Sequence, residues 1–438
     1  MSVEDEKDLP LGRFGRLARL AAAGARTDST LLFAKDARKG AARSAAILGQ
    51  LRGAAAKVGQ MVSYVDGLVP PEHRDAFEST MGMLRDAAPQ SSPEEIRSLL
   101  ESQLGESISD LFSEWDDEPM ASASIGQVHR AKLPDGTPVA VKVQHPGIIE
   151  AMESDLKNAA VVEAIIATMG MAKFESKRLT EEVKDRFREE LDYNLEADRQ
   201  EAFTAIHAGD SRIRIPRIFD THSSSRVLTA ELLTGRNFDQ ARTAPEELRR
   251  SWAETLWRFV YKAILVDGYF NADPHPGNYF FHESGVVTFV DFGCVQKMPE
   301  VRRNAAIRMH WGANHGDQMM FDRGCRDIAD CEGGLYEKLV LDYLRSYFRP
   351  ITDSPFHLSP DYAAHVVRTF KKDYAKALRN YKDGFVPMPE GLLFINRLEF
   401  GFFSIIARLN VTVDFRKVEA AYVSQELIDQ ALLEMPVH

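Results

Sequence analysis

Cysteine is scarce in this chain of 438 residues, where only Cys294, Cys325 and Cys331 occur. No two of them have the C-x-x-C spacing, so the sequence offers neither a disulfide framework nor the usual start of a structural zinc site. Free thiols in a reducing cytosol are the simplest interpretation.

Long apolar runs are also missing. No segment approaches the roughly 18 apolar residues that a membrane-spanning helix requires, and the most apolar stretch, residues 159–170, is interrupted by Glu163. The first residues are acidic and no apolar core follows them, which does not match a signal peptide. We therefore expect a cytoplasmic protein without a transmembrane segment.

Positive charge is in deficit overall, with a net charge of -11 that argues against a general nucleic-acid binder. Residues 11–60 are the exception, because this segment has ten basic residues and only two acidic ones, Asp28 and Asp36. Arg13, Arg16 and Arg19 recur every three residues beside a row of apolar residues. This pattern fits either a helix on an anionic membrane surface, peripheral to the bilayer, or the solvated face of an ordinary helix.

Apolar content of 44% and charged content of 27% are typical of a soluble globular protein. The residue patterns divide the chain into four parts. Residues 1–45 form the basic segment, and residues 46–115 are rich in Ala and Leu at helical spacing. Residues 116–235 carry most of the expected strands, and residues 236–438 return to helical patterns.

Local signals define several elements. Ser92, Pro93 and two acids predict a helix start, and Gly105 predicts its end. Residues 125–133 and 137–144 are β-type runs joined by a Pro-Asp-Gly turn, and residues 148–208 are helical in pattern.

Extended runs follow at residues 214–218 and 226–232, and helices return from about Pro245. A hairpin over residues 278–290, turning at 283–285, interrupts them. A small β-rich lobe before a large helical lobe predicts an α+β fold of the protein-kinase-like, two-lobed type.

The most informative motif lies around that hairpin. Asp273 and Asn278 stand five positions apart in Asn-Ala-Asp-Pro-His-Pro-Gly-Asn, and Asp291 opens an Asp-Phe-Gly tripeptide. Phosphoryl transfer needs an Asp near the acceptor oxygen, plus an Asn and a second Asp to hold divalent metal on the phosphates. We therefore assign Asp273 as catalytic and Asn278 and Asp291 as Mg²⁺ ligands. Gly277 is expected to adopt a positive φ before Asn278.

A nucleotide grip is expected further upstream. Lys142 ends the run Val-Ala-Val-Lys, which matches the strand whose Lys holds the α- and β-phosphates of ATP. The preceding loop has one glycine where a kinase has three, and small residues with serine hydroxyls replace the others. The loop residues assigned to nucleotide binding are Ala121, Ser122, Ala123, Ser124, Ile125, Gly126, Gln127 and Val128.

An acidic cluster is expected to orient Lys142. On one continuous helix, Asp192 and Glu196 share a face and Glu190 lies roughly opposite. One acid can then serve Lys142 while another serves a different partner, and a solvated acidic face is the alternative.

With these residues in hand, the chain resembles the UbiB/AarF family of atypical kinase-like proteins linked to ubiquinone and other prenyl-lipid metabolism. Lys57, Gly59 and Gln60 match the family's K-x-G-Q motif, residues 121–129 its Ala-rich loop, and Glu190 with Asp192 its E-x-D motif. Asp273, Asn278 and Asp291 match its catalytic and metal residues, and Glu196 matches the acid that pairs with the strand Lys.

The resemblance implies a helical extension over the cleft, with Lys57 meeting Glu190 and Asp192. It also implies ATP or ADP and Mg²⁺ as cofactors, with a quinone or prenyl-lipid precursor, an anionic membrane and lipid-biosynthesis enzymes as partners, and no nucleic acid.

Two hypotheses follow. The first is an atypical kinase or ATPase that transfers phosphate in lipid metabolism and does not act on proteins. The second is a nucleotide-gated scaffold that grips a lipid or a partner enzyme with little turnover.

Overall fold

The structure is a computed structural model that describes residues 91–122, 125–157, 177–380, 382–386 and 392–433. The basic N-terminal segment and Lys57, Gly59 and Gln60 lie outside the described residues. The chain forms two compact units, whose described parts are residues 91–131 with 141–191, and residues 132–140 with 192–433. Each unit is described by itself.

The first unit begins with the helix α5 (Pro93–Leu104). The Ser92 hydroxyl accepts from the Glu95 backbone N–H while the Glu95 carboxylate accepts from the Ser92 N–H, which completes a capping box. Gly105 ends the helix at φ 79°, in the left-handed region. Both predicted ends of this helix are confirmed.

The other elements of the first unit are short. They are α6 (Ile108–Leu111), β1 (Glu114–Trp115), β2 (Ala121–Ser122), β3 (Gly126–Lys132), β4 (Pro138–Gln144), α7 (Ile148–Leu156) and α9 (Lys177–Glu189). Helices α7 and α9 pack together, and Arg188 of α9 pairs with Glu153 of α7 at 3.0 Å.

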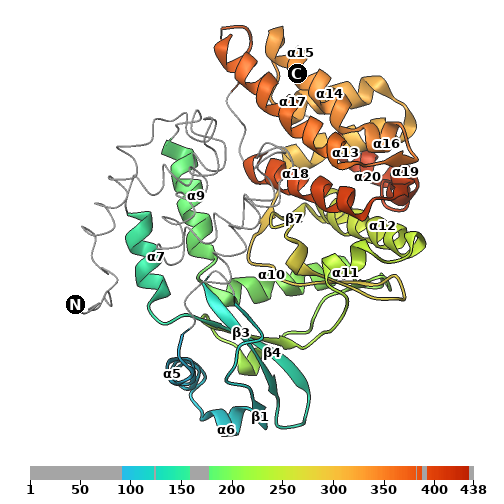
Figure 1. Cartoon of the computed structure of the whole chain (residues 1–438). Coiled ribbons are helices and arrows are strands. Elements are labelled where there is room, and N and C mark those ends of the chain that lie inside the picture. Colours follow the sequence, from blue (N-terminus) through green and yellow to red (C-terminus); the bar gives the residue numbers. More distant parts are fainter. Residues whose placement is uncertain (1–90, 123–124, 158–176, 381, 387–391, 434–438) are drawn as a thin grey trace, which may run out of the picture. The chain divides into compact units, whose positions relative to one another are not determined.

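Strands β1, β3 and β4 are neighbours in that order, and β2 pairs with β3. The strand β6 (Val227–Glu231) belongs to the second unit. Strands β3 and β4 make the hairpin seen in Figure 1. Its turn is closed by hydrogen bonds from the Gly136 N–H to the Leu133 carbonyl at 2.8 Å and from the Leu133 N–H to the Thr137 carbonyl at 2.9 Å. The Pro-Asp-Gly turn prediction is confirmed, with Gly136 at φ 86°.

The second unit begins with α10 (Tyr193–Ile206), β5 (Ile213–Arg214) and the 3₁₀ turn η2 (Asp220–His222). After β6 come α11 (Phe238–Arg242), α12 (Glu246–Lys262) and the π-helical turn η3 (Ala263–Asp267). The strands β7 (Tyr269–Asn271), β8 (Tyr279–Phe281), β9 (Val287–Phe289) and β10 (Val295–Lys297) follow, with the 3₁₀ turn η4 (Pro276–Asn278) before β8.

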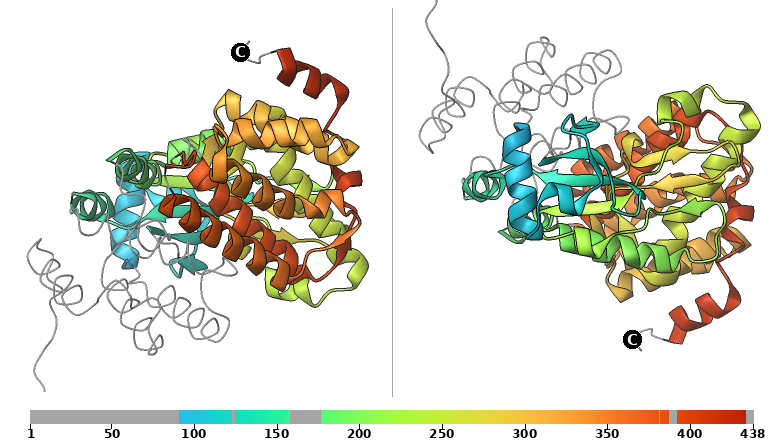
Figure 2. Two further views of the ribbon diagram at one scale, coloured as in Figure 1. Left: turned by 90° about the horizontal axis from the view of Figure 1, so that it is seen from above. Right: turned by 90° about the horizontal axis from the view of Figure 1, so that it is seen from below.

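Helices fill the rest of the second unit. They are α13 (Glu300–His315), α14 (Gln318–Ile328), α15 (Gly334–Tyr347), α16 (Arg349–Thr352), α17 (Pro360–Arg379), α18 (Leu392–Leu409), α19 (Phe415–Glu419) and α20 (Gln425–Leu433), with β11 (Phe356–His357) paired to β12 (Thr412–Val413). Helix α17 packs against both α15 and α18, and Figure 2 shows these orange and red helices side by side. No described helix is both long enough and apolar enough to cross a bilayer.

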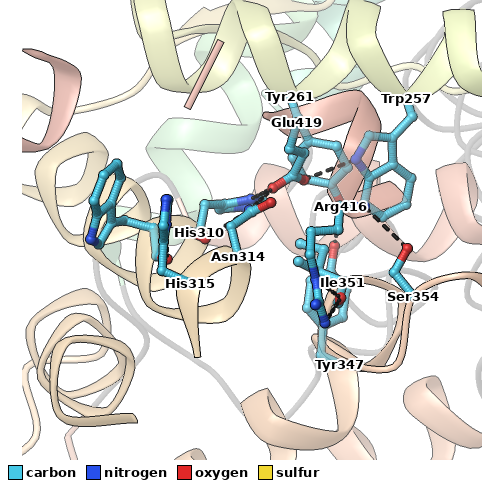
Figure 3. A network of polar contacts seen from close by, with 11 residues as sticks. Trp257, Tyr261, His310, Asn314, His315, Tyr347, Ile351, Ser354, Arg416 and Glu419 are labelled. Atoms are coloured by element: carbon cyan, nitrogen blue, oxygen red, sulfur yellow. Dashed lines mark hydrogen bonds and ion pairs between the residues drawn. The ribbon is translucent and has the colours of Figure 1, made fainter. Parts of the chain in front are cut away.

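A buried acid anchors this helical layer. Glu419 is fully buried and accepts from Trp257 Nε1 at 2.9 Å and from Asn314 Nδ2 at 2.7 Å, while His310 Nδ1 lies 2.9 Å from its second oxygen (Figure 3). Its partners come from α12 and α13, so one carboxyl group holds three helices in register. A buried carboxyl group is tolerated here because its oxygens are hydrogen-bonded.

The structure confirms one further expectation, overturns another and adds two strand pairings. The hairpin over residues 278–290 is confirmed by β8 and β9, with Gly285 at φ 83° in its turn. The parallel pairing of β5 with β9 and the antiparallel pairing of β7 with β10 were not predicted. The single helix expected to carry Glu190, Asp192 and Glu196 is wrong, because α9 ends at Glu189 and α10 starts at Tyr193.

Candidate functional site

The site forms where the end of β7 lies beside the start of β10. These strands pair antiparallel, with Val295 opposite Asn271, and the Ala272 N–H donates to the Cys294 carbonyl at 3.0 Å. Asp273 therefore follows directly from one strand, while the Asp-Phe-Gly segment leads into the other.

Asn271 joins these two segments through its side chain. Its Nδ2 donates to the Asp291 carbonyl at 2.8 Å, and its Oδ1 accepts from the Asp273 N–H at 3.1 Å. One amide group thus fixes the backbone at both acids. Sequence reasoning missed this residue, although an Asn two positions before the Asp is the arrangement in which the side chain caps a turn.

The loop from Asp273 to Asn278 folds back on itself. The Asp273 carbonyl accepts from the His275 N–H at 2.7 Å and from Asn278 Nδ2 at 3.0 Å. The Asn278 N–H donates to the His275 carbonyl at 3.0 Å, and Asn278 is only 8% exposed. The five-residue spacing therefore places the Asn side chain against the backbone of the Asp.

His275 and Gly277 shape the same loop. His275 Nδ1 accepts from the Gly277 N–H at 3.0 Å, and a Cβ on Gly277 would lie 2.9 Å from that nitrogen. The expected positive φ at Gly277 is wrong, because Gly277 is absent from the left-handed region. The glycine is needed for close approach to the imidazole, and the histidine has a structural contact within the loop.

The unusual backbone angle belongs to Asp291, which has φ 66°. A non-glycine residue in this left-handed region carries strain of roughly 1–3 kcal/mol, and such strain is common at functional sites. Its backbone carbonyl is held by Asn271, and its Oδ1 lies 3.4 Å from the Gly293 N–H. Arg199 of α10 donates to the Gly293 carbonyl at 2.7 Å, so the tripeptide is anchored from both sides.

Mainly apolar side chains lie behind the loop. Asp273 and Asn278 border a small cavity of about 10 Å³ whose other walls include Phe259, Tyr279 and Leu398. Burial, with a further contribution from the Asp273 charge, raises the pKa of Tyr279 well above its usual value. Asp273 therefore lies beside mainly apolar side chains, where charge interactions are stronger than in water.

A glycine of α18 allows the loop to lie close to the helix. A Cβ on Gly401 would fall 2.4 Å from Pro274 Cγ, which is too close for any side chain. Helix α18 therefore supports the loop backbone directly beside Asp273.

In the first unit, the expected nucleotide loop is a hairpin. Strand β2 pairs with β3, with Ala121 opposite Val128 and Ser122 opposite Gln127. Ala123 and Ser124 lie outside the described residues. Ile125 and Gly126 are buried, so any contact that they make with a nucleotide is through the backbone.

Gln127 has a packing role. Its side chain is 1% exposed, accepts from the Ser91 N–H at 3.2 Å, and has its Nε2 2.8 Å from His129 Nε2. The other ring nitrogen of His129 lies 2.8 Å from the Asp116 carbonyl. These contacts link β3 to the backbone at Ser91 and Asp116 and so help to hold the hairpin in place.

The charged residues of the expected grip lie on different elements. Lys142 is on β4, Glu190 is in the turn after α9, and Glu196 is on α10, 5% exposed. Asp192 caps α10 by accepting from the Asn194 N–H at 3.0 Å. That cap is the physical reason for the break, since Asp favours a helix N-cap over a helix interior.

Comparison with known families shows that most of these site residues lie within one family domain. Residues 83–321 match the family model described as the ABC1 atypical kinase-like domain, which covers more than half of the chain. The chain belongs to this family. The matched region contains Lys142, Glu196, Asp273, Asn278 and Asp291.

Relatives of this ABC1-family chain carry kinase names. Atypical kinase COQ8B, mitochondrial, of Danio rerio is 29% identical over 307 residues, which is 70% of this chain and 48% of the relative. AarF domain-containing protein kinase 1 of Xenopus tropicalis is 32% identical over 260 residues, covering 57% of this chain and 48% of the relative. The chain spans about half the length of the curated relatives that it matches first.

A solved structure confirms the fold. The complex of Rv3197 with erythromycin from Mycobacterium tuberculosis matches with a TM-score of 0.57 and 26% identity, over 86% of this chain and 93% of the other. The ABC1-family chain thus has the α+β, kinase-like fold expected from its sequence, with a small β-sheet region and a mostly helical remainder.

The donor set of the site fits a magnesium ion. Mg²⁺ prefers oxygen ligands from one or two carboxylates, together with substrate phosphates and water. Asn278 Nδ2 is committed to the Asp273 carbonyl, which leaves Asn278 Oδ1 as the atom suited to a metal. Asp291 contributes a carboxylate on a backbone fixed by Asn271.

Proposed function

We propose that this ABC1-family chain binds MgATP and transfers or hydrolyses the γ-phosphate in support of ubiquinone or other prenyl-lipid metabolism. The observation that carries the proposal is the hydrogen-bonded cluster of Asp273, Asn278 and Asp291, which Asn271 holds together. These residue types supply the acceptor-orienting Asp and the two metal ligands of phosphoryl transfer.

Each residue has a distinct role in the proposed reaction. Asn278 Oδ1 and the Asp291 carboxylate would hold Mg²⁺, which when bound neutralises charge on the phosphates. Asp273 orients the attacking water or acceptor hydroxyl and accepts its proton. The apolar cavity behind Asp273 and Asn278 limits water around both groups and strengthens their electrostatic interactions.

The nucleotide grip is proposed from sequence. Lys142 binds the α- and β-phosphates, with Glu196 as its orienting acid, and residues 121–128 approach the phosphates through backbone N–H groups. Lys57, Gly59 and Gln60 regulate access to the cleft together with Glu190 and Asp192.

The substrate class follows from two observations. The chain has no G-x-G-x-x-G loop and no A-P-E segment after Asp291, so a platform for peptide substrates is not evident. Relatives are named as COQ8 kinases, and the family that the sequence resembles is linked with ubiquinone, which we extend to this chain. We propose a lipid-metabolism role at an anionic membrane surface, with a quinone or prenyl-lipid precursor as the acceptor or ligand.

The test is phosphate release from ATP with Mg²⁺, measured for the unmodified chain and for Asp291→Asn. The substitution keeps the size of the side chain and removes its charge, and we expect turnover to fall by about a hundredfold or more. Asp239→Asn is the matched control, because that side chain is 86% exposed on α11 and should retain full turnover.

Two results would contradict the enzyme assignment. Equal turnover in Asp291→Asn and the unmodified chain would remove Asp291 from the metal site. MgATP binding with no phosphate release, even with lipid vesicles present, would favour the nucleotide-gated scaffold.

A further inference from the structure

A second and larger cavity lies within the helical layer of the second unit. It has a volume of about 120 Å³ and is bordered by residues of α12, η3, α13, α14, α15, α17 and α18. Its walls are mainly apolar, with Met309, Leu339, Phe370 and Ile395 among the lining residues. An engineered apolar cavity of roughly 150 Å³ binds benzene, so a molecule with one ring is a suitable size.

Several polar side chains interrupt these apolar walls, among them Tyr343, Asp373 and Glu399. Tyr343 is 8% exposed, and its hydroxyl has no hydrogen-bond partner among the described residues. A buried hydroxyl that lacks a hydrogen-bond partner costs free energy. A ligand that reaches it would recover part of that cost.

Glu399 is positioned by a tyrosine pair. Tyr347 interacts with the Glu399 carboxyl, and the Tyr347 hydroxyl lies 2.6 Å from that of Tyr261. Tyr261 also belongs to the set of residues around Glu419 drawn in Figure 3. The acid therefore has a fixed place in the wall, although burial raises its pKa to about 8.

The charge of the lining has one sign. Among the described residues that line the cavity, Asp373 and Glu399 are the acids, and neither Lys nor Arg is present. His310 also faces the cavity, but its Nδ1 is paired with Glu419 at 2.9 Å. Aromatic rings from Tyr336, Phe348 and Phe370 add negative π-faces.

We propose that this cavity binds a hydrophobic cation, a small apolar molecule that carries a substituted ammonium group. The ammonium group lies beside Glu399, and the apolar body lies among Leu339, Phe370 and Ile395. A carboxylate together with aromatic faces is a recurring recognition site for quaternary ammonium groups. An anionic ligand is disfavoured because it would face two acids, and the described lining residues include no Lys or Arg to balance them.

Binding of such a cation should depend on pH through Glu399. The other titratable groups facing the cavity are Tyr261 from α12, His310 from α13, Tyr336 and Tyr343 from α15, and Asp373 and Tyr374 from α17. The tyrosines have raised pKa values and stay neutral in the neutral range, and the pKa of Asp373 is raised by burial from an acidic value. Ionisation of Glu399 should therefore increase the affinity for a permanent cation by about tenfold between about pH 7 and pH 9.

The experiment compares two probes of the same shape on the full chain. Phenyltrimethylammonium is the cation, and tert-butylbenzene is its neutral counterpart; binding of each is measured by ligand-observed NMR and calorimetry at about pH 9. We expect Glu399→Gln to weaken binding of the cation by about tenfold or more and to leave binding of the neutral probe unchanged within about twofold. Glu426→Gln, on the exposed face of α20, is the matched control and should bind both probes as the unmodified chain does.

Two variants guard against a folding artefact. Tyr343→Phe keeps the ring and removes only the unpartnered hydroxyl, and Val340→Phe reduces the cavity volume and should weaken both probes. Thermal unfolding of each variant confirms that it is folded. The proposal is overturned if neither probe binds saturably, if Glu399→Gln affects both probes equally, or if Val340→Phe leaves the binding of both unchanged.

Discussion

Asn271 offers the sharpest test of how the site is held together. Replacing it by Ala removes the bond from Nδ2 to the Asp291 carbonyl at 2.8 Å and the bond from the Asp273 N–H to Oδ1 at 3.1 Å. At about 0.5–1.5 kcal/mol for each bond, the free energy of unfolding should fall by about 1–3 kcal/mol.

The effect on activity should be larger than this loss of stability implies. Asp291 has φ 66° and relies on its surroundings to keep a strained conformation. Without the Asn271 amide, the two acids can shift relative to each other, and a misplacement of about 1 Å costs about a hundredfold in rate. We expect phosphate release from MgATP to fall between about tenfold and a hundredfold.

The assay is phosphate release at a temperature where circular dichroism shows every variant to be folded. Asn237→Ala is the matched control, because it removes a side-chain cap from α11 at about 1 kcal/mol without touching the site. Asn271→Ala with the turnover of the unmodified chain would refute the reasoning, as would an equal loss of activity in Asn237→Ala.

Two further predictions concern the packing around the site. Gly401→Ala places a Cβ 2.4 Å from Pro274 Cγ, so the catalytic loop must move. We expect turnover, measured as steady-state phosphate release, to fall by about tenfold. Unchanged turnover would contradict the support assigned to α18. His207 stacks on Phe259 with ring centroids 4.7 Å apart, and burial lowers its pKa from 6.5 to about 3. Because the unfolded chain binds this proton more readily, the free energy of unfolding should fall as pH drops from 6.5 towards about 3, by up to about 1.4 kcal/mol per pH unit. Urea unfolding at several pH values should give a flatter profile for His207→Phe, and an identical profile would exclude His207 as a source of acid sensitivity.

The sequence predicted those elements whose signals are local. The helix from Pro93 to Leu104 has its cap and its terminating glycine next to it in sequence. The two hairpins have their turn glycines at positive φ, as the turn residues predicted. In each case the physical cause lies within a few residues of its effect.

Predictions failed where a local sequence pattern is compatible with two structures, or where a pairing joins distant segments. The acidic run around Glu190 has a continuous helical pattern, yet Asp192 caps a new helix with its side chain. Asp is compatible with both a helix surface and an N-cap, so the pattern alone did not distinguish them. The parallel pairing of β5 with β9 depends on residues far apart in the chain, which no periodicity reveals.

The site shows the same division. The spacing of Asp273, Asn278 and Asp291 indicated that they act together, and the structure brings Asn278 against Asp273 and links the segments of both acids through one amide. Asn271 and Gly401 were missed, because their importance comes from a carbonyl and a proline ring that belong to distant segments. The larger cavity was also missed, since helices far apart in the chain contribute its walls.

The most direct test of the central claim is the binding of ATP with and without Mg²⁺, measured by isothermal titration calorimetry on the unmodified chain and on Asp291→Asn. The proposed metal site predicts that Mg²⁺ strengthens ATP binding to the unmodified chain and that this gain is lost in Asp291→Asn. An equal gain from Mg²⁺ in both proteins, or no ATP binding to the unmodified chain, would contradict it.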